Sequence, residues 1–76
     1  DNSVQLYPNP GTDQVQLESS IRMEGVRLMN LQGKVMLELE TNQLEDQLNT
    51  ASLPTGLYFV EITTREGRWI GRWLKK

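Results

Sequence analysis

The chain of 76 residues contains no cysteine and no histidine. Without cysteine there is no disulfide framework, no thiolate metal site and no thiol nucleophile. Without histidine, the commonest general base and the commonest metal ligand are missing as well. The sequence also has no G-x-S-x-G motif, no P-loop and no G-x-G-x-x-G motif. We therefore predict a protein that is not an enzyme and needs no cofactor.

The sequence has neither a long apolar run nor a strong net charge. The net charge is -2, so the charge balance does not favour nucleic acid as a partner. No run approaches the ~18 apolar residues of a membrane span, and no charged-then-apolar signal peptide opens the chain. The abrupt start at Asp1 fits a piece of something longer. We expect one domain, residues 1–76, at the end of a larger secreted protein.

Basic residues gather at the C-terminal end. No lysine or arginine precedes Arg22, whereas the final strand and the turn before it carry Arg65, Arg68, Arg72, Lys75 and Lys76. Two interpretations stay open. The cations either are the solvated charges that edge strands often carry, or they meet an anionic surface.

Apolar and polar residues alternate along most of the chain, which is typical of half-buried β-strands. The segment "SSIRMEG" is interpreted as a link between two such strands. Residues 42–52 are expected to form a short edge strand followed by a loop, with a helical turn as the alternative. About seven short strands separated by turn residues predict an all-β, antiparallel sandwich.

Glycines and prolines mark the expected turns. "NLQGK" and "TREGR" are typical of hairpin loops, so Gly33 and Gly67 are predicted to have a left-handed backbone. In "LPTGLY", Pro54 suits the second position of a type I turn and Gly56 suits the fourth.

The stretch "LYPNPG" interrupts the chain soon after its start. Pro8 and Pro10 lack an N–H and fix φ, so they are predicted to end the first strand. Asn9 is expected to bond local backbone through its side chain, and Gly11 allows a sharp turn.

A few polar and aromatic side chains are candidates for chemistry. Glu38 and Glu40 share one face of a predicted strand, which favours a solvated surface over an acid–base pair. Calcium takes oxygen ligands from loops, so Asp13, Glu45 and Asp46 are candidates for a calcium site, but no spaced acidic loop motif supports it.

Trp69 and Trp73 share one strand face with Gly71 between them. The two rings either pack over the core or over the glycine, or they form a flat platform that stacks on sugars or bases.

The order of these features resembles a known family. A "YPNP" opener, "NLQGKV", "LPTGLYFVEI", a Gly-Arg hairpin and a basic final strand follow one another. This order is similar to the type A C-terminal sorting domain of the type IX secretion system (the Por secretion system) of Bacteroidetes, over essentially the whole chain. Trp69 and Trp73 depart from it, since β-branched and lysine-rich residues are expected there. The positions that match the family motifs are Tyr7, Pro8, Asn9, Pro10, Gly33, Lys34, Leu53, Pro54, Gly56, Tyr58, Gly67, Lys75 and Lys76.

The resemblance implies a fold and a role. The fold is a small immunoglobulin-like antiparallel β-sandwich of about seven strands at the end of a secreted cargo. The expected partners are the type IX translocon, its shuttle proteins and a sortase-like cysteine peptidase, while the oligomeric state stays open. The cargo is expected in the periplasm in transit and then at the cell surface or outside the cell. The cleavage site is expected upstream of Asp1, and the end that the translocon recognises is expected to comprise Arg72, Leu74, Lys75 and Lys76.

Two other functions remain open at this point. The tryptophan pair would suit a carbohydrate-binding or adhesive β-sandwich appended to a secreted enzyme, which predicts that both rings are exposed. A plain spacer domain of an extracellular protein is the third possibility, and it predicts export that does not depend on this domain.

Overall fold

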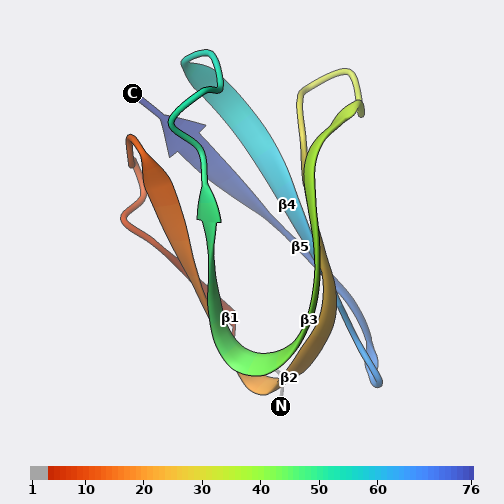
Figure 1. Cartoon of the computed structure of the whole chain (residues 1–76). Coiled ribbons are helices and arrows are strands. Elements are labelled where there is room, and N and C mark those ends of the chain that lie inside the picture. The colour runs from red at the N-terminus through yellow and green to blue at the C-terminus, as the bar shows by residue number, and fades with distance from the viewer. Residues whose placement is uncertain (1–3) are drawn as a thin grey trace.

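The structure, a computed structural model, describes residues 4–76. It contains one antiparallel sheet of five strands (Figure 1). The second strand is central and pairs with the first, third and fourth, while the fifth pairs with the fourth. The strands are β1 Val4–Tyr7, β2 Gln14–Met29, β3 Val35–Asn49, β4 Gly56–Thr64 and β5 Gly67–Lys75.

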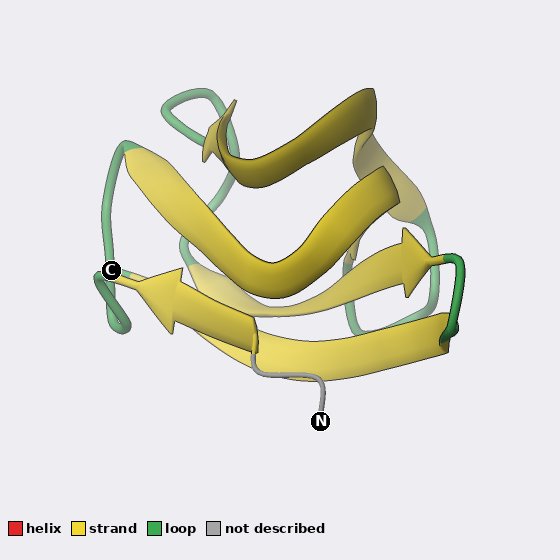
Figure 2. Ribbon diagram, turned by 90° about the horizontal axis from the view of Figure 1, so that it is seen from below, coloured by secondary structure: helices red, strands yellow, loops and turns green. Residues whose placement is uncertain are grey.

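β2 and β3 form one long hairpin that bends in the middle. Its pairing runs from Gln14 opposite Asn49 to Met29 opposite Val35, with register shifts on either side of Met23. Such bulges bend a strand and increase its twist. The first half of β2 pairs with β1, and the second half pairs with β4. The sheet therefore curls into a half-barrel, which is clearest from below (Figure 2).

The prediction of an all-β antiparallel fold is confirmed, but the prediction of seven strands is wrong. The stretch "SSIRMEG", interpreted as a link, lies inside β2. Residues 42–49 belong to β3, and the loop follows them. The count was too high because bulges disturb the alternation of apolar residues at the bend, although the backbone pairing continues through it.

Two predicted glycine conformations are confirmed. Gly33 has a φ of 87° in the β2–β3 loop, and Gly67 has a φ of 133° where β5 begins after the turn at residues 65–66. The β2–β3 loop is further fixed by Asn30, whose Oδ1 accepts the N–H groups of Gln32 and Lys34. In the β3–β4 loop, the hydrogen-bonded turn lies earlier than Pro54, because the N–H of Leu53 donates to Thr50 O.

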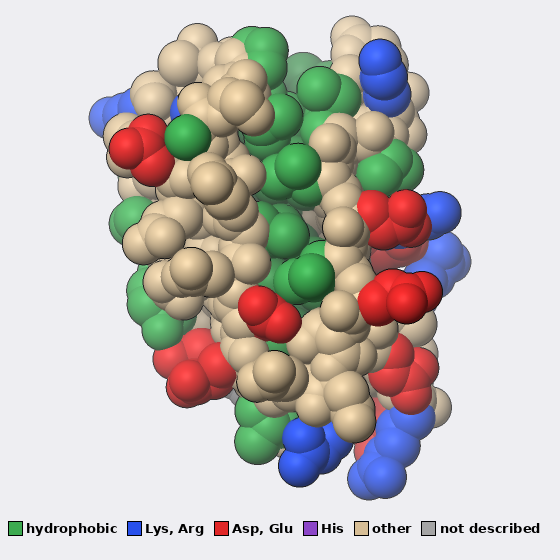
Figure 3. Space-filling model, viewed as in Figure 1, with side chains coloured by type: hydrophobic (Ala, Val, Ile, Leu, Met, Phe, Trp, Pro, Cys, Tyr) green, Lys and Arg blue, Asp and Glu red, His purple; other side chains and the backbone are tan. Residues whose placement is uncertain are grey.

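The core lies between the two halves of the curled sheet. Val15 and Leu17 come from the first half of β2, while Val26 and Leu28 come from the second half, and all four are buried. β4 and β5 close the back of this core with three more buried side chains, Val60, Ile62 and Trp73. Seen as in Figure 1, hydrophobic side chains follow the opening between the two arms of β3 (Figure 3). One curved sheet therefore provides both walls of the core.

A matched pair of leucines tests this assignment of the core. Leu28 is fully buried, whereas Leu44 on β3 is 46% exposed. We expect Leu28→Ala to lower the free energy of unfolding by about 2–5 kcal/mol, because it leaves a cavity. Leu44→Ala should change it by less than about 0.5 kcal/mol. Urea denaturation followed by tryptophan fluorescence measures both values, and equal losses would contradict this core.

Candidate functional site: a clasp around the C-terminal strand

Three segments that are far apart in the sequence meet at the end of β5. They are residues 8–11, the turn at 50–53 and residues 72–76, and we call them together the C-terminal clasp. In Figure 1 the C-terminus lies beside the chain that leaves β1 and beside the loop that leaves β3. Each contact within the clasp satisfies a polar group that would otherwise be exposed at a sheet edge or left without a partner.

The proline-rich opener covers part of the edge of β5. Asn9 Nδ2 donates to Arg72 O at 3.0 Å, and Leu74 N donates to Asn9 Oδ1 at 3.1 Å. Gly11 N donates to Leu74 O at 2.9 Å, and Lys76 N donates to Gly11 O at 2.8 Å. The amide of Asn9 and the backbone of Gly11 thus take the places of two residues in a neighbouring strand. Both Tyr7–Pro8 and Asn9–Pro10 peptide bonds are cis.

Trp73 fixes the same segment from inside the core. Its ring is fully buried, and its Nε1 donates to Pro8 O at 2.7 Å. The ring also packs against Tyr58, with 6.4 Å between ring centroids. A Cβ on Gly11 would lie 2.8 Å from both Pro8 O and the Trp73 ring, so only glycine fits here.

Lys75 holds the turn after β3. Only 7% of its surface is exposed. Its Nζ donates to three backbone carbonyls, those of Thr50 at 2.5 Å, Ala51 at 3.1 Å and Leu53 at 2.6 Å. An ammonium has three donors and no acceptor, so the three carbonyls satisfy it completely. A buried charge is tolerated only with such partners.

Thr50 connects this turn to the chain that enters β2. Its N–H donates to Asp13 O at 2.8 Å, and its hydroxyl donates to Thr12 O at 3.0 Å. The Thr50 side chain is fully buried. The turn at 50–53 is therefore fixed from two sides, by the start of β2 and by the end of β5.

This geometry corrects the expectation of an accessible basic end. Arg72 and Lys76 are exposed and Leu74 is 37% exposed, but Lys75 faces inward. Beyond Arg72, the outward backbone groups of β5 are already bonded to Asn9 and Gly11. The side chains of Arg72, Leu74 and Lys76 are thus accessible beside a closed stretch of backbone, whereas that of Lys75 is not.

The two tryptophans do not form an exposed flat pair. Trp73 is in the core, and Trp69 is half-buried against it. The Trp69 ring lies over Gly71, where a Cβ would come within 2.1 Å of the ring. A tryptophan that covers a glycine on a strand compensates for the missing side chain by packing. The arrangement that would have supported a sugar-binding platform is therefore absent from residues 69–73.

The remaining motif residues lie in turns and at strand ends. Tyr7 ends β1, and its hydroxyl donates to Glu18 Oε2 at 2.6 Å. This hydrogen bond, with smaller effects of desolvation and of the charges on Glu18 and Glu45, raises the pKa of Tyr7 above its ordinary 10.0. Tyr58 donates through its hydroxyl to Pro54 O at 2.5 Å, which ties the start of β4 to its own loop. The side chains of Pro10 and Lys34 are exposed.

Two of the carboxylates that the sequence singled out have polar partners on the sheet. Glu38 pairs with Arg27 on the outer face of the sheet, and Asp46 accepts a hydrogen bond from the hydroxyl of Thr41. Among residues 4–76 no group of three or more acidic side chains is placed to hold a metal ion. Within the same residues, no helix is long and apolar enough to cross a membrane.

Fold and site together define a small all-β domain in which several of the motif residues, Pro8, Asn9 and Lys75 among them, fix the last strand. Comparison with known proteins identifies the family of this domain. Residues 5–76 match the family described as "Secretion system C-terminal sorting domain". The chain therefore belongs to this family, the sorting domains of the type IX secretion system, which are non-catalytic and direct export across the outer membrane.

One curated protein gives a further comparison. The chain is 34% identical over 67 residues to "Beta-agarase D" of Zobellia galactanivorans. The match covers 88% of this chain but only 13% of that protein. The likeness thus concerns one domain of a much longer relative.

Reasoning from the sequence missed most of the clasp. Asn9 was expected to bond local backbone, but its partners lie 63 and 65 positions away. Lys75 was grouped with exposed cations, although the buried tryptophan two residues earlier faces the same side of the strand. That alternation was the available signal for an inward lysine. Nothing in the sequence indicated which backbone carbonyls would accept hydrogen bonds from the Lys75 ammonium.

Adjacent lysines test the role of Lys75. Lys75→Met removes three charge-assisted hydrogen bonds and leaves carbonyls unpaired, so we expect the free energy of unfolding to fall by at least about 1.5–3 kcal/mol. Lys76→Met removes the same charge from an exposed side chain and should change it by less than about 0.5 kcal/mol. Urea denaturation of both variants gives the comparison. A fully stable Lys75→Met protein would show that the clasp does not depend on the ammonium.

Proposed function

We propose that the secretion machinery recognises this sorting domain as a folded surface built around the clasped end of β5, and not as a linear tail. The observation that carries the proposal is the position of Lys75. Its side chain lies inside the domain and bonds three carbonyls of another loop. A receptor that read the last residues as an extended peptide would first have to break these bonds.

Membership of the family supports a proposal about the partners. We propose that the domain engages the type IX translocon and its shuttle proteins in the periplasm. A sortase-like cysteine peptidase then removes the domain, so that the cargo stays at the cell surface or is released. The exposed side chains of Arg72, Leu74 and Lys76 are the proposed contact residues at the closed end of β5.

We also propose that the curled sheet corresponds to an immunoglobulin-like sandwich. Its two halves face each other across the core, as the two sheets of such sandwiches do. What supports this is the burial of Val15 and Leu17 from one half of β2 and of Val26 and Leu28 from the other. The bends of β2 and β3 then take the place of connections between separate sheets.

A reporter fusion tests the proposal. Residues 1–76 are fused to a fluorescent protein that carries a signal peptide, in a bacterium with a working type IX system. We expect the reporter at the cell surface or in the medium, and we expect deletion of Leu74–Lys76 to leave it in the periplasm. Normal surface delivery of the truncated fusion would contradict the proposal.

Point variants separate a folded surface from a linear tail. Lys75→Met keeps the length of the tail but opens the clasp, so export should fall in proportion to the fraction of unfolded domain. Lys76→Met keeps both length and clasp and is the matched control. If both variants lowered export equally, although only Lys75→Met lowers stability, a linear signal would be the better explanation.

A further inference from the structure

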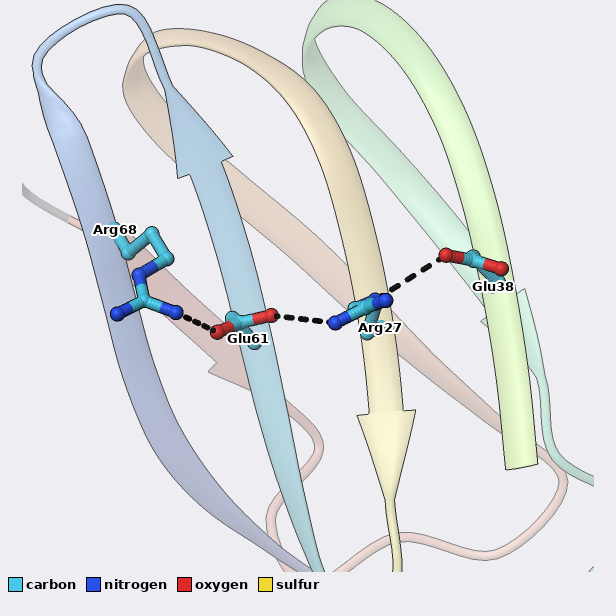
Figure 4. A network of polar contacts seen from close by, with 4 residues as sticks. All are labelled: Arg27, Glu38, Glu61 and Arg68. Atoms are coloured by element: carbon cyan, nitrogen blue, oxygen red, sulfur yellow. Dashed lines mark hydrogen bonds and ion pairs between the residues drawn. The ribbon is translucent and has the colours of Figure 1, made fainter. Parts of the chain in front are cut away.

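A row of alternating charges crosses the outer face of the sheet and ends at the edge of β5 (Figure 4). Arg27 Nε lies 3.2 Å from Glu38 Oε2, and Arg27 Nη1 lies 3.7 Å from Glu61 Oε1. Arg68 Nη1 lies 3.0 Å from Glu61 Oε2. From β3 through β2 and β4 to β5 the signs therefore alternate, and the row ends in a cation.

The last member of this row is open to solvent. The side chain of Glu61 is only 8% exposed, whereas that of Arg68 is 68% exposed. A guanidinium has five N–H donors in a fixed planar fork. Among the described residues 4–76, Arg68 uses its side chain only for Glu61. A carboxylate placed beyond β5 would therefore continue the alternation.

The backbone of β5 is covered at one end of its outer edge and open at the other. Arg72 O and both backbone groups of Leu74 point away from β4, because they bond Asn9 and Gly11. In an antiparallel strand, alternate residues direct their N–H and C=O to the same side. The backbone groups of Arg68 and Ile70 thus point outward too. Within the part of the chain that the structure describes, no residue bonds them.

The side chains along this open edge form a simple pattern. Arg68, Ile70 and Arg72 point to the outer face, where Ile70 is 57% exposed. Ile70 borders a shallow apolar depression that is also lined by Leu31 and Phe59. Arg72 has no ion-pair partner among residues 4–76. The edge therefore presents a cationic, an apolar and a second cationic side chain, at intervals of two residues.

We propose that residues 68–72 of β5 bind an extended segment of another polypeptide as an added strand. Main-chain hydrogen bonds to Arg68 and Ile70 would supply affinity, as in other cases of strand addition. An apolar side chain of the segment lies over Ile70, and carboxylates two positions to either side face Arg68 and Arg72. The biological meaning of this partner rests on the proposed function, but binding is measurable with the isolated chain.

A second copy of the same edge does not fit this site. Antiparallel pairing of two copies about Ile70 would place Arg68 of each copy opposite Arg72 of the other. Like charges directly opposite each other across two strands are destabilising. The same two arginines that would repel a copy attract a segment with carboxylates at those positions, so the partner is a different chain.

A synthetic peptide tests the proposal directly. It has seven residues, with threonine at each odd position and glutamate, valine and glutamate at the even ones. Its sequence is the same in both directions, so it fits parallel or antiparallel pairing. We expect ¹⁵N NMR shift changes and slower amide exchange at Arg68 and Ile70. A peptide with lysine in place of glutamate should leave these amides unchanged.

Charge reversal makes the test specific. Arg72→Glu replaces an exposed ion pair by repulsion, so the glutamate peptide should bind about five- to tenfold more weakly and the lysine peptide more tightly. Arg65→Glu makes the same change of charge in the turn before β5, outside residues 68–72, and is the matched control. Equal binding of both peptides to the unaltered chain would overturn the proposal.

A backbone variant distinguishes main-chain hydrogen bonding to the peptide from attraction between charges alone. Ile70→Pro removes the outward N–H without removing a bond to β4, and proline is tolerated at such edge positions. It should abolish slower exchange at Arg68 while the domain stays folded. Unaltered peptide binding by this variant would overturn strand addition, and so would concentration-dependent dimers of the unaltered chain in sedimentation.

The same variant separates this inference from the proposed function. In the reporter fusion, failure of the unaltered domain to export its cargo contradicts the proposed function and leaves the peptide result standing. Export of the Ile70→Pro fusion at the normal level, together with no peptide binding by the unaltered chain, overturns only the added strand.

Discussion

The ammonium group of Lys75 is the contact on which the end of this domain depends. It lies inside the molecule, with three backbone carbonyls around it. Lysine suits this position because a compact ammonium with three donors can bond three separate carbonyls, whereas a planar guanidinium favours paired acceptors. The ammonium bonds the turn at 50–53 to the end of β5, and Thr50 bonds the same turn to Thr12 and Asp13, just before β2.

The second constraint is the bend in the long hairpin. A domain of 76 residues has little volume in which to bury apolar surface. By bending β2 and β3, the chain makes both walls of its core from one sheet and needs few connections. Because the sheet curls without closing into a barrel, β5 keeps a free edge. Part of that edge is covered by Asn9 and Gly11, while Arg68 and Ile70 remain at the open part.

The sequence predicted the local features of the fold better than its long-range contacts. Alternation of apolar residues indicated strand structure along most of the chain, and glycine chemistry predicted the turns at Gly33 and Gly67, since both signals depend on neighbours in the chain. The bends in β2 and β3 escaped prediction because a bulge interrupts the alternation in the same way as a turn does.

The clasp was hidden for a different reason. Its family motifs were visible, and the comparison with known proteins confirmed the family. The partners of Asn9, Trp73 and Lys75, however, lie 22 to 65 positions away. No local rule connects such residues. Only the curl of the sheet brings the opener, the turn at 50–53 and the last strand to one place.

The clasp also has a consequence for the time at which the domain can fold. The hydrogen-bond partners of Pro8 and Asn9 are Arg72, Trp73 and Leu74, which are among the last residues of the described chain. Contacts between such distant residues require a large loop to close before they give any stability. A chain that is still emerging, or still threading through a membrane pore, lacks these partners. The clasp therefore forms only after residues 72–76 are available, so the opener takes its final place later than the strand pairs that form earlier in the chain.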